Sequence, residues 1–369
     1  MTAPTPTVKA SSPSTPPRSS NLNPAMSALS PRPVPASSLP LGYDKRLMLF
    51  SGRANPELAN KISGKLGVDL GGVTLKTFSN GEVYCRYEES IRGADVFIVQ
   101  LTCGNPATGV NANDALMELL VMIDAAVGAS AHRVIAVSPW YGYSRQDKKG
   151  MPREPITARL VADILEAAGV DRVLTMDLHA GQVQGFFRKP VDHMTAVPIL
   201  AEHFTMLLDV DHDEIVVVSA DAGRVKLAKK FAEMLGADLA LITKERPEHQ
   251  EAEATNVIGR VRGKVCILLD DMIDTAGTLC AGGQALLDHG ATRVFACATH
   301  PVFSGRALER LEASVFEKVV VTDTIPIDPT SRPDNVQVLS VAPILADTIS
   351  NVFNDDSVSG LFHGGNQLF

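Results

Sequence analysis

The sequence VCILLDDMIDTAGTL, residues 265–279, places two acids beside a loop that is suited to binding an anion. Five apolar residues lead into Asp270 and Asp271, and a loop of mainly small residues, 274–278, follows. Small residues let backbone N–H groups approach a phosphate, and the start of the next helix adds partial positive charge. Carboxylates accept hydrogen bonds from neutral hydroxyls. The combination predicts a sugar phosphate, with its hydroxyls on the acids and its phosphate on the loop. The alternative is that Asp274 only caps the helix while the acid pair is solvated.

A second candidate group follows the apolar run 173–176. Asp177 and His179 alternate at this predicted strand end, so their side chains are expected to share one direction. An imidazole beside carboxylates can join a Mg²⁺ site, although Mg²⁺ prefers oxygen ligands and keeps several waters. Structural hydrogen bonding is the alternative role for this pair.

Two clusters of cations complete the residues that could do chemistry. The segment 138–149 joins an aromatic loop to Arg145, Lys148 and Lys149, and Arg153 follows, which predicts a polyphosphate clamp in a chain of net charge −8. A solvated basic loop is the alternative. Lys244 and Arg246 open a polar loop, where closure could bring positive charge to a phosphoryl-transfer transition state. The nearest approach to a Walker A loop, at 259–265, has the wrong spacing.

The bulk composition limits the class of protein. The 369 residues are 45% hydrophobic, which is enough for about two domains of about 150 residues each. The negative charge disfavours a nucleic-acid partner, and the lack of an apolar run of about 20 residues predicts a soluble, cytoplasmic protein without membrane contact. The five cysteines include no C-x-x-C pair, so neither a zinc site nor a disulfide framework is expected.

The chain is organised as a polar extension followed by alternating strands and helices. Residues 1–43 are rich in Ser, Pro, Thr and Ala and contain no acid, which predicts a disordered extension, a start assigned too early with Met26 as the true one, or a transit peptide. After residue 44, strands separated by helices predict an α/β fold with mainly parallel sheets. The expected strands are 47–50, 96–100, 134–137, 173–176, 215–218, 239–242, 266–269, 294–296 and 319–321, and the expected helices are 55–66, 112–127, 156–168, 223–235, 277–288 and 342–353.

Segments spread along residues 45–363 resemble the ribose-phosphate pyrophosphokinases of the phosphate-activated class, in register and in order. The segment 265–279 is similar to the binding signature for 5-phosphoribosyl 1-pyrophosphate (PRPP), which phosphoribosyltransferases share. Segments that resemble the pyrophosphokinases alone are FSNGEVYCRYEESIRGADVFIVQ (78–100), YGYSRQDKK (141–149), REPITARL (153–160), DLHAGQVQGFF (177–187), SADAGRVK (219–226) and ATHPVFSG (298–305). Arg224 departs from the commonest pattern, since many members have a glycine there.

The resemblance implies two similar phosphoribosyltransferase-like (Rossmann-like) domains, each with a mainly parallel sheet flanked by helices. Their expected bounds are 44–196 and 197–354, with a tail at about 355–369 packing back on the first domain. The implied reaction transfers the pyrophosphoryl group of Mg–ATP to the 1-hydroxyl of ribose 5-phosphate, giving PRPP and AMP for nucleotide, histidine and tryptophan biosynthesis. The implied partners are Mg²⁺, inorganic phosphate and ADP as effectors, and further copies of the chain in a hexamer.

The resemblance also implies a role for each matching residue. The implied catalytic cations are Lys244 and Arg246. Adenine would be held by Phe78, Asn80 and Glu82 of a neighbouring subunit, and ATP by Arg145, Gln146, Lys148 and Arg153. The implied metal residues are His179 and Asp221, and the implied ribose 5-phosphate residues are Asp221, Asp270, Asp271, Asp274, Thr275, Ala276, Gly277 and Thr278.

Two alternatives to a synthetase remain. A phosphoribosyltransferase would explain the loop 274–278 but neither the cations of 145–149 nor the segment 78–82. A non-catalytic subunit associated with a synthetase would be expected to have lost catalytic positions, whereas Lys244, Arg246 and His179 are all present.

Overall fold

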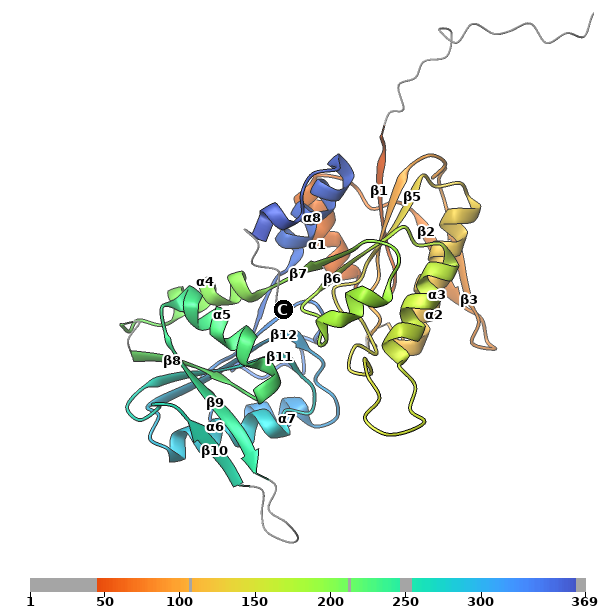
Figure 1. The fold of residues 1–369 in the computed structure, drawn as a ribbon. Helices are drawn as coiled ribbons and strands as arrows, with labels where there is room; N and C mark the ends of the chain where they lie inside the picture. The colour runs from red at the N-terminus through yellow and green to blue at the C-terminus, as the bar shows by residue number, and fades with distance from the viewer. Residues whose placement is uncertain (1–44, 106–107, 212–213, 246–253, 363–369) are drawn as a thin grey trace, which may run out of the picture. The chain divides into compact units, whose positions relative to one another are not determined.

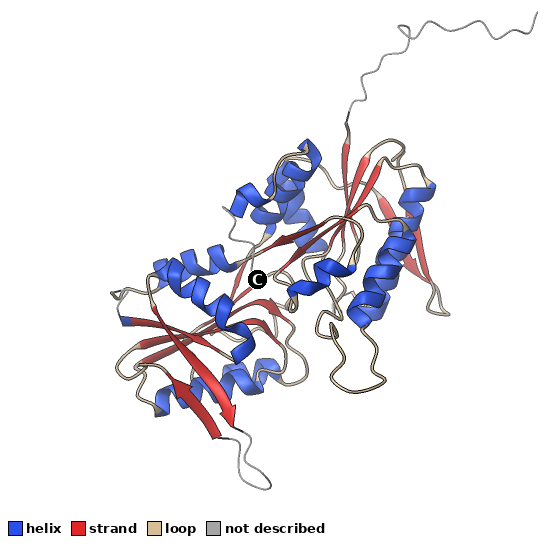
Figure 2. Cartoon of the chain, viewed as in Figure 1, coloured by secondary structure: helices blue, strands red, loops and turns tan. Residues whose placement is uncertain are grey.

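The computed structural model describes residues 45–105, 108–211, 214–245 and 254–362, which belong to a compact unit that begins at Lys45. This unit is an α/β structure with two large sheets and helices packed on both faces of each (Figures 1 and 2). The predicted fold class, mainly parallel sheets flanked by helices, is confirmed. In the described part of the chain, no helix combines the length and apolar character needed to cross a membrane. The predictions for residues 1–43 lie outside the described residues.

The first sheet contains five parallel strands in the order β1-β4-β5-β6-β7. Successive side chains of a strand point to opposite faces, so Leu49 packs in one core cluster with α1, whereas Met48 and Phe50 pack in another with α2 and α3. A separate antiparallel hairpin, β2–β3, packs against α2. The elements are β1 (Leu47–Ser51), α1 (Pro56–Leu66), β2 (Val73–Thr77), β3 (Val83–Tyr87), β4 (Asp95–Val99), α2 (Ala112–Gly128), β5 (Arg133–Val137), α3 (Thr157–Ala168), β6 (Arg172–Met176), η3 (Gly181–Phe186) and β7 (Val191–Met194).

The second sheet contains seven strands in the order β10-β9-β8-β11-β12-β13-β14, parallel except for the β9–β10 pair. Its central strand, β11, is buried along most of its length because helices cover both faces. The elements are α4 (Val197–Leu207), β8 (Ile215–Ser219), η5 (Ala222–Arg224), α5 (Val225–Leu235), β9 (Asp238–Glu245), β10 (Ala254–Ile258), β11 (Val265–Ile273), α6 (Gly277–Asp288), β12 (Arg293–Pro301), α7 (Ala307–Glu312), β13 (Val319–Thr322), β14 (Val336–Leu339), α8 (Ala342–Asn354) and η6 (Ser359–Phe362).

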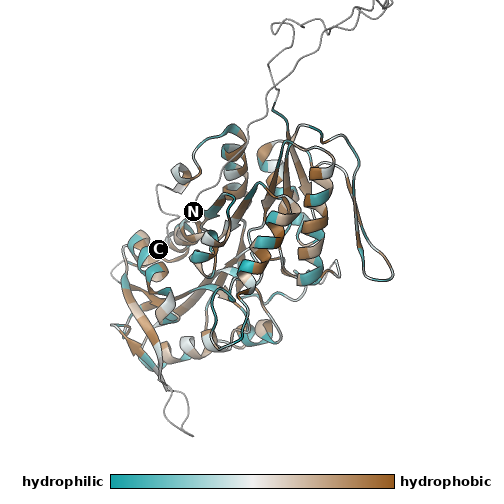
Figure 3. Cartoon of the chain, turned by 45° about the vertical axis from the view of Figure 1, so that its right-hand side comes forward, coloured by the Kyte–Doolittle hydropathy of each residue, from teal (hydrophilic) through white to brown (hydrophobic). Residues whose placement is uncertain are grey.

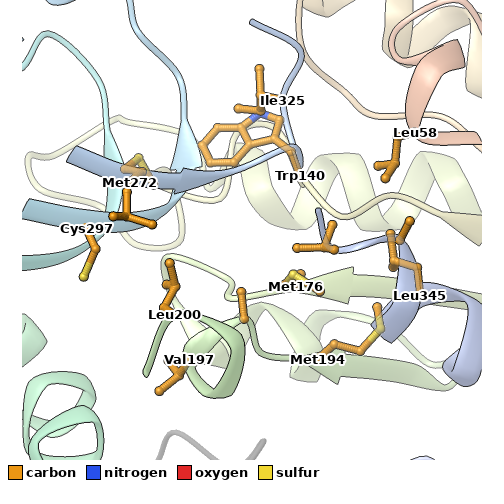
Figure 4. Packing of buried hydrophobic residues seen from close by; sticks show 14 of the residues in the cluster. Leu58, Trp140, Met176, Met194, Val197, Leu200, Met272, Cys297, Ile325 and Leu345 are labelled. Carbon is orange, nitrogen blue, oxygen red and sulfur yellow. The ribbon is translucent and has the colours of Figure 1, made fainter. Parts of the chain in front are cut away.

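One buried cluster includes side chains from both sheets. Figure 4 shows Met176 and Met194 of the first sheet in the same cluster as Met272 and Cys297 of the second, with Trp140 nearby. Figure 3 shows apolar strands in the interior and helices with polar outer faces. Because this core is shared, the carboxyl ends of β6 and β11 are held together, and this is where the candidate site forms.

The predicted strands and helices are all present, with shifted ends. β11 continues through the acid pair to Ile273 because Asp270 and Met272 stay paired with Ala298 and His300 of β12. The sequence analysis did not assign α4, α7, β2, β3, β7, β10 and β14. The predicted domain boundary falls at Ala196, the residue before α4, and the division into two domains stays a prediction.

A buried carboxylate links the first sheet to the end of α8. Asp95 is 1% exposed, forms an ion pair with Arg133, and lies 2.8 Å from His132 Nδ1. Arg133 also donates to Asp355, directly after α8, with Nη1 2.9 Å from Oδ1. Burial alone would raise the pKa of Asp95, but the hydrogen bonds from Arg133 and His132 outweigh it and lower that pKa.

We expect Asp95→Asn to lower the free energy of unfolding at pH 7 by about 2 kcal/mol, because Arg133 loses its buried charged partner and keeps only the exposed Asp355; Arg133 is partly exposed, which reduces the 3–5 kcal/mol of a fully buried pair. Since the folded pKa is lowered, the contribution of Asp95 is complete above the unfolded pKa of about 3.9 and is lost as pH falls through the folded pKa. Thermal unfolding at pH 7 and pH 3 tests this. The matched control is Asp69→Asn, at an exposed carboxylate; equal losses in both variants at pH 7 would contradict the prediction.

Candidate functional site

The predicted sugar-phosphate loop connects β11 to α6. Ala276 has a φ of 61°, in the left-handed region, which turns the chain sharply before α6 begins at Gly277. The loop is anchored from outside, because Phe303 N donates to Ile273 O and Ser304 N donates to Asp274 O. A Cβ added to Gly277 would meet no protein atom closer than 3.6 Å. The small residue therefore leaves room for a ligand at the helix N-terminus, where backbone N–H groups lack intrahelical acceptors.

Two arginines contact this loop. Arg145 Nη1 donates to Asp274 Oδ2 at 2.7 Å, although Arg145 follows β5 of the other sheet. Arg310 Nη1, at the end of α7, donates to the carbonyl oxygen of Thr275 at 2.7 Å. Burial would raise the pKa of Asp274, but hydrogen bonds to Ser304 and Arg145 lower it, so this carboxylate is ionised at neutral pH. Arg145 thus connects the predicted ATP segment to the predicted ribose 5-phosphate loop.

The acid pair has two unequal members. Asp271 is 3% exposed, with Oδ2 2.9 Å from His179 Nδ1 and Oδ1 2.9 Å from Arg224 Nε. Burial opposes its ionisation, but the bond to His179 and the charge of Arg224 lower its pKa. Burial and the neighbouring Asp271 charge instead raise the pKa of Asp270. A pair with one ionised and one protonated member carries less negative charge than two carboxylates, which lessens its repulsion of a phosphate at Asp274–Thr278.

The loop after β6 brings His179 to the acid pair but directs Asp177 elsewhere. Asp177 has a φ of 36°, so strand alternation does not continue through it. Its Oδ2 accepts from Ala196 N at 2.8 Å and from Thr299 Oγ1 at 2.6 Å. His300 Nε2 lies 3.0 Å from the carbonyl oxygen of Met176, so β12 holds the end of β6 in place. The expectation that Asp177 and His179 share one direction is therefore wrong, and the carboxylate partner of His179 is Asp271.

Two cavities meet at this point. A cavity of about 230 Å³ is lined by the acid pair and the loop 273–279. A second cavity, of about 400 Å³, is lined by four cationic side chains and an equal number of carboxylates: Arg145, Lys148, Arg224 and Lys226, and Asp147, Asp177, Asp221 and Asp271. Residues that line both are Arg145, His179, Asp221 and Asp271. Asp221, which follows β8, accepts from Arg224 N with its Oδ1 at 3.0 Å. An acidic, loop-bound cavity thus lies beside a second cavity with four cationic side chains, which suits a sugar phosphate next to a polyphosphate.

Several predicted residues lie outside these two cavities. Gln146 lines a neighbouring cavity of about 660 Å³ together with Tyr143 and Trp140, and Arg153 is exposed. Phe78, Asn80 and Glu82 lie at the β2–β3 hairpin, beside α2 and away from β11 (Figure 1). Phe78 is 50% exposed and meets Tyr84 with ring centroids 5.9 Å apart.

The two predicted catalytic cations stand at the end of β9 and directly after it in the sequence. The backbone of Lys244 belongs to β9 and pairs with Thr255 of β10. Arg246 lies outside the described residues. Their predicted role stays a prediction.

Sequence reasoning missed three contributors to the site. Arg310 reaches the loop from α7, which was not predicted, and Thr299 contacts Asp177 from β12. Arg224 was noted only as a departure from a common glycine, yet it contacts both His179 and Asp271. The one available signal was this departure, since an arginine among acids and a histidine has a ready set of partners.

Known proteins similar to this chain cover nearly all of its described part. A ribose-phosphate pyrophosphokinase of Clostridium perfringens is 51% identical over 320 residues, which is 87% of this chain and 98% of the relative. One of Staphylococcus saprophyticus is 49% identical over 316 residues, 86% of this chain and 97% of the relative. The crystal structure of phosphoribosylpyrophosphate synthetase from Mycobacterium smegmatis has a TM-score of 0.77 and 46% identity, and covers 84% of this chain and 99% of that one.

The fold and the grouping of acids and arginines at the strand ends define an α/β transferase of phosphorylated compounds. The family model for the N-terminal domain of ribose phosphate pyrophosphokinase matches residues 47–169, and that for the phosphoribosyl synthetase-associated domain matches residues 248–363. The chain belongs to the ribose-phosphate pyrophosphokinase family, whose members are pyrophosphoryl transferases. The predicted family is therefore confirmed.

Proposed function

We propose that this protein makes PRPP by transferring the pyrophosphoryl group of Mg–ATP to the 1-hydroxyl of ribose 5-phosphate, with release of AMP. The observation that carries the proposal is the junction of the two cavities at Arg145, His179, Asp221 and Asp271. A phosphoribosyltransferase needs the loop 274–278, but the four cations of the adjoining cavity are the feature that suits a nucleotide polyphosphate as second substrate.

In this proposal the sugar phosphate lies along the end of β11. Its phosphate accepts hydrogen bonds from backbone N–H groups at the start of α6, and the Thr275 and Thr278 hydroxyls are further donors. Its ring hydroxyls bond to Asp270 and Asp271, of which the ionised Asp271 is the stronger acceptor. Arg145 and Lys148 neutralise the ATP phosphates from the second cavity.

The reaction demands positioning more than covalent participation by the protein. The anomeric hydroxyl oxygen attacks the β-phosphorus of ATP in line and releases its proton to water. The bond between that phosphorus and the oxygen it shares with the α-phosphorus breaks, and AMP leaves with this oxygen. The protein aligns the two substrates and spreads positive charge around the phosphoryl group in transfer. No covalent phospho-enzyme forms. Lys244 and Arg246 supply part of this charge from their loop.

The residues at the junction fit a Mg²⁺ ion that arrives with ATP. Among the described residues, no group of three or more His, Cys, Asp or Glu side chains is arranged to hold a metal. Mg²⁺ does not require one, because it keeps several waters and takes its other ligands from one or two carboxylates and substrate phosphates. Asp221, exposed in the cavity wall, and His179 would hold it. When bound, the ion neutralises phosphate charge and orients the polyphosphate.

We propose that the chain acts as an oligomer. Phe78, Asn80 and Glu82 are on a hairpin outside both cavities, which supports their proposed role in the site of another copy of the chain. Full activity then requires a homo-oligomer, which we propose is a hexamer. Inorganic phosphate and ADP are the proposed effectors. The proposed location is the cytoplasm.

The test is to incubate the purified protein with ATP, Mg²⁺ and ribose 5-phosphate, with and without inorganic phosphate. We expect AMP and PRPP in equal amounts, measured by ion-exchange chromatography. Omission of ribose 5-phosphate is the control and should abolish AMP formation. Absence of AMP under both phosphate conditions would refute the proposal, and pyrophosphate release from PRPP and a purine base would instead indicate a phosphoribosyltransferase.

A further inference from the structure

The Arg224 guanidinium connects three strand ends at the junction of the two cavities. Nη1 donates to the carbonyl oxygen of His179 at 2.9 Å, and Nη2 lies 2.5 Å from His179 Nδ1. On the other side, Nε lies 2.9 Å from Asp271 Oδ1 and 3.8 Å from Asp270 Oδ1. The Arg224 side chain is only 15% exposed, so these contacts are largely shielded from solvent. One side chain thus touches the backbone and ring of His179 and the carboxylate that also faces this ring.

The backbone of Arg224 is itself fixed. Its N–H donates to Asp221 Oδ1 at 3.0 Å in the η5 turn, and α5 begins at the next residue, Val225. The side chain therefore starts from a rigid point between Asp221 and a helix. A bond to His179 from such a point limits how far the loop after β6 can move away from β11.

The contacts at His179 Nδ1 are chemically exclusive. An arginine N–H can only donate, so Nδ1 must be bare when it bonds to Arg224, and it must carry a proton when it bonds to Asp271. When Nδ1 carries the proton, it donates to Asp271, while Arg224 bonds to the His179 carbonyl oxygen and pairs with the same carboxylate. Nε2 is then the bare nitrogen of the neutral ring and is the one available to a ligand.

We propose that Arg224 is a positioning residue that orients the His179 imidazole against Asp271 and keeps the loop after β6 at the end of β11. The inference rests on the proposed function, because His179 and Asp271 are the side chains shared by the two substrate cavities. This positioning role requires a guanidinium, whose N–H donors lie in one plane and point in several directions. A lysine has one nitrogen and cannot bond to the His179 carbonyl, the ring and Asp271 in a fixed plane.

The test compares Arg224→Ala and Arg224→Lys with the wild-type protein. Outer residues that orient a ligand histidine commonly account for 10- to 100-fold in activity, so we expect Arg224→Ala to lower kcat/KM for ATP by about 10- to 100-fold. Arg224→Lys should recover only a small part of that loss. The matched control is Arg293→Ala, which removes an arginine paired with Glu317 on the opposite end of β12 and should leave kcat/KM unchanged.

The second readout does not depend on activity. With ¹³C-labelled histidine, the ring signal of His179 is assigned by its loss in His179→Asn, and we expect this signal to shift in Arg224→Ala but not in Arg293→Ala. Circular dichroism establishes that each variant is folded; if Arg224→Ala does not fold, the same spectra are compared for Arg224→Lys. An unchanged His179 signal, or full kcat/KM in Arg224→Lys, would overturn the proposal. An inactive wild-type protein would refute the proposed function, while the ring signal still reports on Arg224.

Discussion

Asp271→Asn is expected to lower kcat/KM for ribose 5-phosphate by about 10- to 100-fold, since a hydrogen bond to a charged group contributes about 1.5–3 kcal/mol and about 1.36 kcal/mol corresponds to a tenfold change in rate. The amide keeps the shape of the side chain but loses the charge that faces both His179 and Arg224. The amide also has an NH₂ group, which would face another donor, either the Arg224 N–H or a ring N–H of His179. Initial rates at varied ribose 5-phosphate, with ATP and Mg²⁺ saturating, measure this loss.

Asp270→Asn provides the matched control at the adjacent residue. Asp270 Oδ1 accepts from the backbone N–H of Asp271 at 2.9 Å and is 3.8 Å from Arg224, a weaker link to the cation. The raised pKa of Asp270 favours its protonated form. An amide resembles a protonated carboxyl group more closely than it resembles a carboxylate. We expect a loss of less than about tenfold, equivalent to one neutral hydrogen bond. Equal losses in the two variants would contradict the unequal roles that the structure gives them.

Local patterns predicted most of the fold. The apolar run 265–269 required burial on both faces, and β11 is the central strand of its sheet. The loop 274–278 predicted a helix start, and α6 begins at Gly277 as expected. The hairpin β2–β3 was missed because only apolar runs were assigned as strands, although VTLKT of β2 alternates apolar and polar residues as a half-buried strand does. In α4, likewise, the buried residues Val197, Leu200, Ala201 and Phe204 follow helical spacing, so the signal was present.

The contacts within the site could not be predicted in the same way. His179 meets Asp271, which lies 92 residues later in the chain, and Arg145 meets Asp274 across 129 residues. Such pairs depend on how the carboxyl ends of two sheets are brought together, and this depends on the shared core around Trp140, Met176 and Met272. The nearby candidate, Asp177, was excluded by its left-handed backbone and its bonds to Ala196 and Thr299. Sequence identified the chemical groups, whereas tertiary packing selected their partners.

The double variant Lys244→Ala/Arg246→Ala is expected to have the largest effect on turnover. Removing one group that stabilises developing charge commonly costs 10²- to 10³-fold in kcat, so we expect a fall in kcat on the order of 10³-fold for the pair. Cations that act mainly in the transition state lower kcat and leave KM for ATP nearly unchanged. Steady-state rates at varied ATP separate the two parameters.

The matched control for this variant is Lys229→Ala, at an exposed lysine of α5 whose ion pair with Glu233 lies on the helix surface. It should keep wild-type kcat and KM. If the double variant instead raises KM for ATP on the order of 10³-fold, the two cations stabilise the ground state and the transition state equally. They would then belong to the ATP-binding set with Arg145 and Lys148. Because Arg145 and Lys148 are the proposed ground-state partners of the ATP phosphates, we propose that Lys244 and Arg246 act on the charge that develops in the transition state.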